Sequence, residues 1–145
     1  MTKVAGTMEL IENVHLVLRD KDGNVKDERR IKNTVTTAGK NGAADQILAS
    51  PSLGKPTHMA TGTGTPTGTA LGTELSRVAL TSKNRSGAVV TMVGDWAAGT
   101  GTGAITEAGL FDAASTGNMW CSQSFSVVNK GASDTLQITW TLTFA

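Results

Sequence analysis

Hydrophobic and polar residues alternate along several stretches of the chain, the pattern of β-strands with one buried face. The clearest stretch is Thr135–Phe144, in which large apolar residues alternate with threonine or glutamine. Met8–Leu18 alternates in the same way, and Glu12 is the one break on its apolar face. Three further segments predict strands: Ala88–Trp96, Ala104–Phe111 and Met119–Val127.

Turn and helix signals lie between these strands. Asp20–Asn24, with the sequence DKDGN, predicts a hairpin turn, because Asp-Gly tolerates the positive φ angles that such turns require. Val25–Val35 is polar and highly charged, which is typical of a solvated edge strand. Thr36–Pro51 predicts a helix, and Ala70–Val78 a second short one. The first of these helices has four apolar residues near a spacing of 3.6: Ala43, Ala44, Ile47 and Leu48.

The pattern as a whole predicts a mainly β fold, a β-sandwich or barrel-like domain with one or two short helices. The composition agrees, because the 145 residues include 17 glycines and 22 threonines, and threonine favours strands while glycine marks turns. The first residues, MTKVAGT, show no periodicity. We therefore expect a flexible N-terminal arm at residues 1–8 and a single β-rich domain at residues 9–145.

Charge and cysteine content narrow the range of functions. The 13 Lys and Arg residues nearly balance the 12 Asp and Glu residues, which disfavours nucleic acid as a partner. No stretch of about 18 apolar residues is present, so we expect no membrane partner. Cys121 is the only cysteine, which excludes an internal disulfide and fits synthesis in a reducing cytoplasm.

The stretch Thr61–Thr69 raises the question of a phosphate-binding loop, because it contains five threonines and three glycines around one proline. A Walker loop needs a Gly-Lys-Ser/Thr sequence, and this stretch has no lysine. Gly39-Lys40 and Gly54-Lys55 are followed by asparagine and proline and do not fit either. We therefore expect a strand near His58–Thr61 followed by a connecting turn, and no bound cofactor.

Other candidate chemistry is equally sparse. A Gly-x-Gly-x-x-Ala match beginning at Gly99 leads into a predicted strand, whereas a dinucleotide site needs a helix there. His15 and His58 have no metal-ligating neighbours at the usual spacing, and Cys121 reads as a small buried thiol. The sequence thus predicts no catalytic residues, no metal site and no enzymatic activity.

One acidic residue stands out by its position. Glu107 lies in an apolar strand between Ile105 and Leu110, and a buried acid needs a partner. Arg77 is the best candidate for this partner, because it is the only charged residue between Glu74 and Lys83. We predict that Arg77 and Glu107 form a structural ion pair.

Four blocks of sequence, in order, resemble a family of small structural proteins of tailed bacteriophages. The blocks are NTVTTAGKNGAADQIL, THMATGTGTPTGTALGTELSR, GAITEAGLFDA with GNMWCSQSF, and DTLQITWTLTF, and together they span roughly residues 33–144. The resemblance implies a virion component without catalytic activity, located either in the head or in the tail. The chain has no heptad pattern or collagen-like run of the kind that elongates fibres, which favours the head.

We therefore expect a capsid decoration (cement) protein that is made in the host cytoplasm and stabilises the outer surface of the assembled head. The expected partners are the major capsid protein and further copies of the chain in a homotrimer. The arm expected to contact the capsid consists of Thr2, Lys3, Val4, Ala5, Gly6 and Thr7. The alternative is a tail-tip or tail-fibre protein that binds glycans through exposed Trp96 or Trp120, because Trp140 lies on an apolar face.

Overall fold

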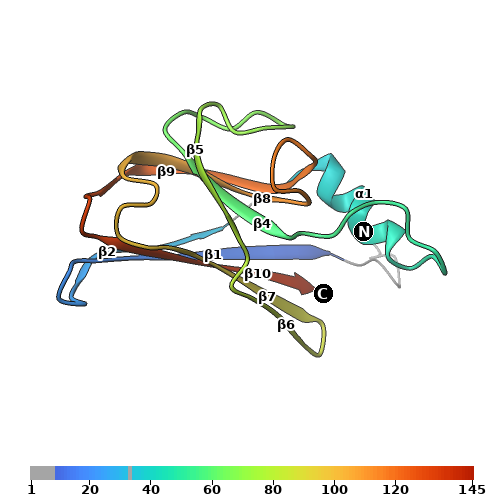
Figure 1. The fold of residues 1–145 in the computed structure, drawn as a ribbon. Coiled ribbons are helices and arrows are strands. Elements are labelled where there is room, and N and C mark those ends of the chain that lie inside the picture. The colour runs from blue at the N-terminus through green and yellow to red at the C-terminus, as the bar shows by residue number, and fades with distance from the viewer. Residues whose placement is uncertain (1–8, 33) are drawn as a thin grey trace, which may run out of the picture.

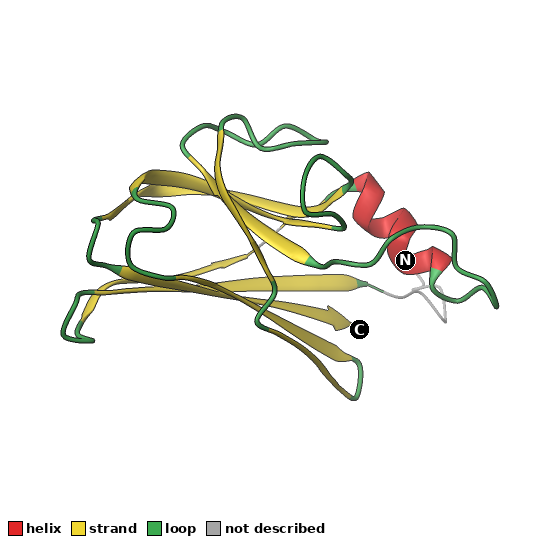
Figure 2. Ribbon diagram, in the orientation of Figure 1, coloured by secondary structure: helices red, strands yellow, loops and turns green. Residues whose placement is uncertain are grey.

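Two five-stranded antiparallel sheets form the protein in a computed structural model that describes residues 9–32 and 34–145 (Figures 1 and 2). The predicted arm, Thr2–Thr7, lies outside the described residues. The elements are β1 (Leu10–Arg19), β2 (Val25–Lys32), β3 (Thr34–Val35), α1 (Thr37–Asp45), β4 (His58–Gly62), β5 (Glu74–Ala79), β6 (Ser82–Ser86), β7 (Val89–Trp96), β8 (Gly103–Phe111), β9 (Met119–Lys130) and β10 (Thr135–Phe144).

The first sheet has the strand order β2-β1-β10-β7-β6, and the second has the order β3-β9-β8-β4-β5. Figure 2 shows the two sheets as layers, with the helix at one end. The predicted mainly β, sandwich-like class is confirmed, with one helix among the described residues. No helix in the described ranges has the length and apolar character needed to cross a bilayer.

The main core lies between the sheets and is built from the predicted alternation. In the register of β1 with β10, Val14 faces Trp140 and Leu16 faces Ile138, and all four side chains are buried. The second sheet adds residues such as Leu110 from β8. Every second side chain of the core strands in both sheets therefore points into one shared apolar layer. Burial of this apolar surface is the main favourable contribution to the free energy of folding.

The polar hairpin also forms as predicted. One carboxylate oxygen of Asp20 accepts hydrogen bonds from the backbone amides of Asp22 and Asn24, both at 2.9 Å, and Gly23 has a φ of 85°. The chain then returns as β2, which is an edge strand with a largely exposed set of charged side chains. Charges of this kind on an edge strand oppose pairing with another sheet.

Helix α1 packs closely on Trp120 of β9. Thr36 caps its N-terminus by accepting a hydrogen bond from the Gly39 amide at 3.0 Å, and the Thr36 hydroxyl also donates to the Trp120 carbonyl. Gly39 faces the backbone of Trp120 and Gly42 faces its indole, so that a Cβ at either position would overlap with it. These glycines therefore allow helix and strand to approach closely, and Gly39 of the Gly39-Lys40 pair serves this packing.

The helix is shorter than the predicted Thr36–Pro51. It ends at Asp45, whose carboxylate accepts hydrogen bonds from the amides of Ser52 and Leu53 and so turns the chain back. Ile47 and Leu48, two of the four apolar residues near helical spacing, therefore lie beyond the helix, and they are 87% and 58% exposed.

The prediction of a second helix at Ala70–Val78 is wrong. Glu74–Ala79 forms strand β5, which pairs with β4 so that Val78 lies opposite Met59. A short mixed segment fits both a helical and a strand period, and pairing with β4 decides between them. The edge strand β6, with the polar sequence SKNRS, gave no hydrophobic signal and was not predicted.

Candidate functional site

The glycine- and threonine-rich stretch forms a connection over the outer face of the second sheet. After the predicted strand, observed as β4, residues 63–73 lead to β5, and the Thr63 amide binds the Thr73 carbonyl at 2.9 Å. Leu71 of this connection joins a second, smaller core, which we call the outer core and which comprises Ala60, Leu71, Phe111 and Met119. Figure 1 shows the connection on the side of the second sheet that faces away from the first.

A buried carboxylate holds this connection in place. Glu107 is fully buried and accepts hydrogen bonds from the amides of Gly64 and Gly72, each at 2.6 Å, and from Thr73 at 2.9 Å. Thr106 adds a hydrogen bond from its hydroxyl to the Gly64 carbonyl at 2.7 Å. Charge-assisted hydrogen bonds to backbone amides are among the strongest in proteins, so Glu107 fixes the path of the connection.

The glycines of the connection make room for this carboxylate. A Cβ at Gly62 or Gly64 would lie within 2.6 to 2.9 Å of Glu107 Oε2, closer than real contacts allow. The backbone amides of the connection therefore surround an internal anion. The stretch that resembles a phosphate-binding loop by composition uses its amides on the protein's own glutamate.

Arg77 holds a second connection, residues 112–118 between β8 and β9. The guanidinium pairs with Glu74 at 2.6 Å and donates to the carbonyl oxygens of Ala113 and Thr116, at 2.9 and 2.8 Å. It also lies over the ring of Phe111, 3.7 Å from the ring centre. Arg77 thus links β5, the connection and the outer core by ionic, hydrogen-bonding and cation–π contacts.

The prediction that Arg77 and Glu107 form an ion pair is therefore wrong, because each residue has other partners. The residues lie on β5 and β8, which flank β4, but Arg77 binds Glu74 while Glu107 binds backbone amides. The reasoning that a buried acid needs partners was right. The partners are amides from a connection whose path the sequence did not predict.

An irregularity in the pairing of β8 with β9 accompanies the outward orientation of Glu107. The register between β8 and β9 shifts between Ile105 and Glu107, and both Ile105 and Leu110 reach the main core. These two residues are five positions apart, and a regular strand directs residues at odd separations to opposite faces. The apolar pattern itself therefore contained a signal for a bulge.

A second buried glutamate, Glu12, lies between the sheets. The Cys121 thiol donates to its Oε1 at 3.0 Å, so β9 reaches across the core to β1. Burial raises the pKa of Glu12 to about 7, and the opposing contributions of the Cys121 thiol and the Trp140 indole are smaller. Cys121 is itself buried, as predicted, and the break at Glu12 in the apolar alternation marks this polar cluster within the core.

The tryptophans predicted as sugar-binding candidates lie inside the protein. Trp96 and Trp120 are 1% and 6% exposed, and Trp140 is fully buried. A sugar ring stacks on an exposed aromatic face, so neither Trp96 nor Trp120 offers such a platform. This corrects the feature on which the glycan-binding alternative depended.

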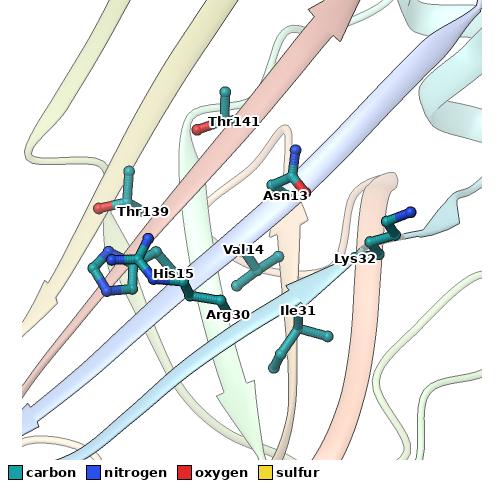
Figure 3. A pocket seen from close by; sticks show the side chains of 8 residues that line it. All are labelled: Asn13, Val14, His15, Arg30, Ile31, Lys32, Thr139 and Thr141. Atoms are coloured by element: carbon teal, nitrogen blue, oxygen red, sulfur yellow. The ribbon is translucent and has the colours of Figure 1, made fainter.

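His15 lines a shallow hollow on the outer face of the first sheet (Figure 3). The hollow has a volume of about 270 Å³ and gathers polar side chains from β1, β2 and β10. His15 Nε2 lies 2.8 Å from Glu28 Oε1, and this contact and the positive side chains around it lower the pKa of Glu28. His58 is remote from the hollow and contacts the Thr57 hydroxyl through Nδ1 at 2.8 Å.

Residues 9–32 and 34–145 contain no group of three His, Cys, Asp or Glu side chains that could hold a metal ion. Comparisons with protein-family models, curated proteins and solved structures give no match to this chain. No matched protein therefore indicates the function of the sandwich or of its two connections, and the basis for a functional proposal is the residues themselves.

Proposed function

We propose that the protein is a non-enzymatic structural protein of a tailed-bacteriophage virion, and specifically a capsid decoration protein. It binds the outer surface of the assembled head as a homotrimer and stabilises the shell against dissociation. Its partner is the major capsid protein, and the arm Thr2–Thr7 adds contacts to a neighbouring subunit. The proposal rests on the four sequence blocks that resemble phage structural proteins.

The observation that carries the proposal is the spatial relation of these blocks. The block NTVTTAGKNGAADQIL supplies α1 and its cap, and Thr36 of this block bonds to Trp120 in the GNMWCSQSF block. The block THMATGTGTPTGTALGTELSR supplies β4, the first part of β5 and the connection between them, and Glu107 of GAITEAGLF holds that connection. Residues that resemble one family in the sequence thus contact one another in the fold.

These contacts suit a binding surface better than a catalytic centre. Glu107 and Arg77, the most heavily bonded ionic groups of the second sheet, spend their hydrogen bonds on the protein's own backbone. The result is a pair of connections held by internal hydrogen bonds, and surface elements that are ordered before binding lower the ordering cost of association. Such preorganisation supports a module that attaches to an assembled shell.

Charge indicates how the protein attaches. With a net charge of +1, long-range attraction to a charged surface contributes little, so apolar contacts and strand edges supply the affinity. Such contacts are screened little by salt, and a trimer multiplies weak individual contacts into avidity. Attachment should therefore persist at high salt.

Co-sedimentation with undecorated capsids tests the proposal. Purified protein is mixed with capsids at low salt and at about 1 M salt, where the Debye length falls to about 3 Å. We expect saturable binding at both concentrations and decorated capsids that survive a higher temperature. A variant lacking residues 2–7 should fold normally and bind more weakly.

Failure of co-sedimentation would contradict the proposal. Binding to host cells or to purified tails in place of capsids would instead support the tail-tip or tail-fibre alternative. Since Trp96 and Trp120 are buried, glycan binding in that case would have to use another surface.

A further inference from the structure

An apolar groove opens at the end of the sandwich that carries α1. Figure 2 shows the two sheets diverging toward this end, and the groove between them has a volume of about 470 Å³. Its floor is formed by apolar side chains from both sheets, including Val90, Met92, Trp120, Leu142 and Phe144. Met92, Trp120 and Leu142 are themselves buried, so the apolar surface that these floor residues leave accessible is mainly that of the half-buried Val90 and Phe144.

Three cations line the same groove. Lys83 and Arg85 of the edge strand β6 lie opposite Met92 and Val90, which places them on the inner face of the first sheet. Lys55 approaches from the segment after α1. Burial and, second, the neighbouring Lys55 lower the pKa of Lys83, so the cations are close enough to disfavour one another. None of the described residues that line the groove is acidic.

Exposed apolar residues continue from the groove along the chain. Gln46 and Lys55 line it, and the segment between them carries Ile47 and Leu48, both of which are largely exposed. Large exposed apolar groups beside an open groove are typical of an interaction surface. The edge position of β6 leaves one side of its backbone available to an extended chain.

We propose that this groove binds an extended acidic peptide segment of a partner protein. Its apolar side chains pack on the floor at Val90 and Phe144, and its carboxylates meet Lys55, Lys83 and Arg85. The charge of the groove selects this occupant, because a neutral or basic segment would leave three adjacent cations uncompensated. The first eight residues of the chain carry Lys3 and no acid, so they are a poorer match. The inference does not rest on the virion assignment.

Fluorescence anisotropy with defined peptides tests the inference. The probe is a fluorescein-labelled, end-capped peptide that alternates glutamate with leucine, and the comparison peptides alternate lysine with leucine and glutamate with serine. We expect saturable binding of the first peptide only, because it alone offers both carboxylates and apolar groups. Affinity should fall as salt rises, since part of it comes from exposed charges.

A double charge reversal locates the site. Lys55→Glu with Arg85→Glu should weaken binding about tenfold or more, because each exposed attraction is replaced by repulsion. The matched control, Lys21→Glu with Lys32→Glu, changes net charge equally at exposed positions outside the groove and should leave affinity unchanged. Lys83 is left intact, since its ammonium also donates to the Pro56 carbonyl at 2.8 Å. Thermal melts confirm that both variants fold.

Several results would overturn the inference. Absence of binding, equal binding of the lysine peptide, or equal losses in both double variants would each exclude an acidic segment in this groove. If binding requires deletion of residues 2–7, the chain's own N-terminal segment is the occupant. A further outcome is that sedimentation reveals an oligomer in which the peptide cannot bind. If the double substitution Ile47→Ser with Leu48→Ser converts this oligomer to monomers, the occupant of the groove is a second copy of the chain.

Discussion

Two buried glutamates in this protein solve the same physical problem differently. Glu107, beneath the connection of residues 63–73, receives hydrogen bonds from three backbone amides. The donors described for Glu12, between the sheets, include the Cys121 thiol, and the Trp140 indole has a smaller influence on its pKa. A thiol is a weak donor, whereas three amides replace much of the hydration that a carboxylate loses on burial.

The comparison teaches that donors, more than depth, decide what a buried acid does. Glu107 organises a surface, because satisfying it requires that three amides of one connection converge on it. Glu12 instead keeps its proton at pH values well above those at which an ordinary carboxyl group ionises, because its pKa is about 7. One glutamate therefore organises the backbone of a connection, and the other makes stability depend on pH.

Replacing Glu107 with glutamine should have the largest effect. Glutamine keeps the shape but presents an NH₂ group where Oε1 faces the Gly72 amide or where Oε2 faces the amides of Gly64 and Thr73. At least one buried donor then loses its acceptor and the remaining hydrogen bonds lose the charge of their acceptor, so we expect a loss of about 3 kcal/mol in the free energy of unfolding. Chemical denaturation monitored by tryptophan fluorescence measures it.

The control is Glu28→Gln, which alters an exposed glutamate on β2. A surface change of this kind should stay within about 0.5 kcal/mol of the wild type. Equal, mild effects of the two substitutions would show that Glu107 does not hold the connection.

Glu12 should impose a pH dependence of the opposite sense from that of an ordinary paired carboxylate. Its pKa is 4.5 when exposed and about 7 in the folded protein, so the folded state binds the proton more tightly than the unfolded state. The stabilisation is complete below pH 4.5, declines as the pH rises toward 7 and is lost above it. The shift corresponds to about 3 kcal/mol.

Unfolding free energies measured between pH 4 and pH 8 test this dependence, with Glu12→Gln as the matched variant. The glutamine cannot ionise, so its profile should lack the decline that the wild type shows over this range. Parallel profiles for the two proteins would mean that Glu12 titrates normally in the fold.

Sequence patterns predicted the strands with clear apolar alternation well, but they missed β5 and β6 and predicted the partners of buried acids poorly. Period-two alternation located β10 to the residue, because both faces of that strand have uniform environments. Glu107 was found as a buried acid needing partners, but its partners come from glycine-rich backbone, which leaves no side-chain pattern. Arg77 was misassigned for the same reason, since carbonyl oxygens at residues 113 and 116 have no sequence signature. The groove beside β6 depends on how the sheets diverge, which local periodicity does not encode.

Arg77→Lys tests the second connection, residues 112–118, which Arg77 holds as Glu107 holds residues 63–73. Lysine keeps the positive charge but cannot reach Glu74, Ala113 and Thr116 together, and it loses the planar stack on Phe111. We expect a loss of about 1–2 kcal/mol, smaller than for Glu107, because Glu74 is partly exposed and water can replace some contacts. Amide hydrogen exchange should increase in residues 112–118 and not in residues 63–73. Equal acceleration of both connections would contradict separate roles for Arg77 and Glu107.

Cys121→Ala should have the smallest effect on stability and the most specific effect on Glu12. The thiol lowers the pKa of that carboxyl by donating to it, so its removal should raise the pKa above the present value of about 7. Carbon-13 NMR of the glutamate carboxyl groups follows the titration directly, and the midpoint for Glu12 should move to higher pH. Cys121→Ser serves as the rescue, because a hydroxyl also donates and should hold the midpoint near or below the wild-type value. If alanine and serine shift the midpoint equally, the change reflects altered packing, and the thiol–carboxyl hydrogen bond does not tune the proton on Glu12.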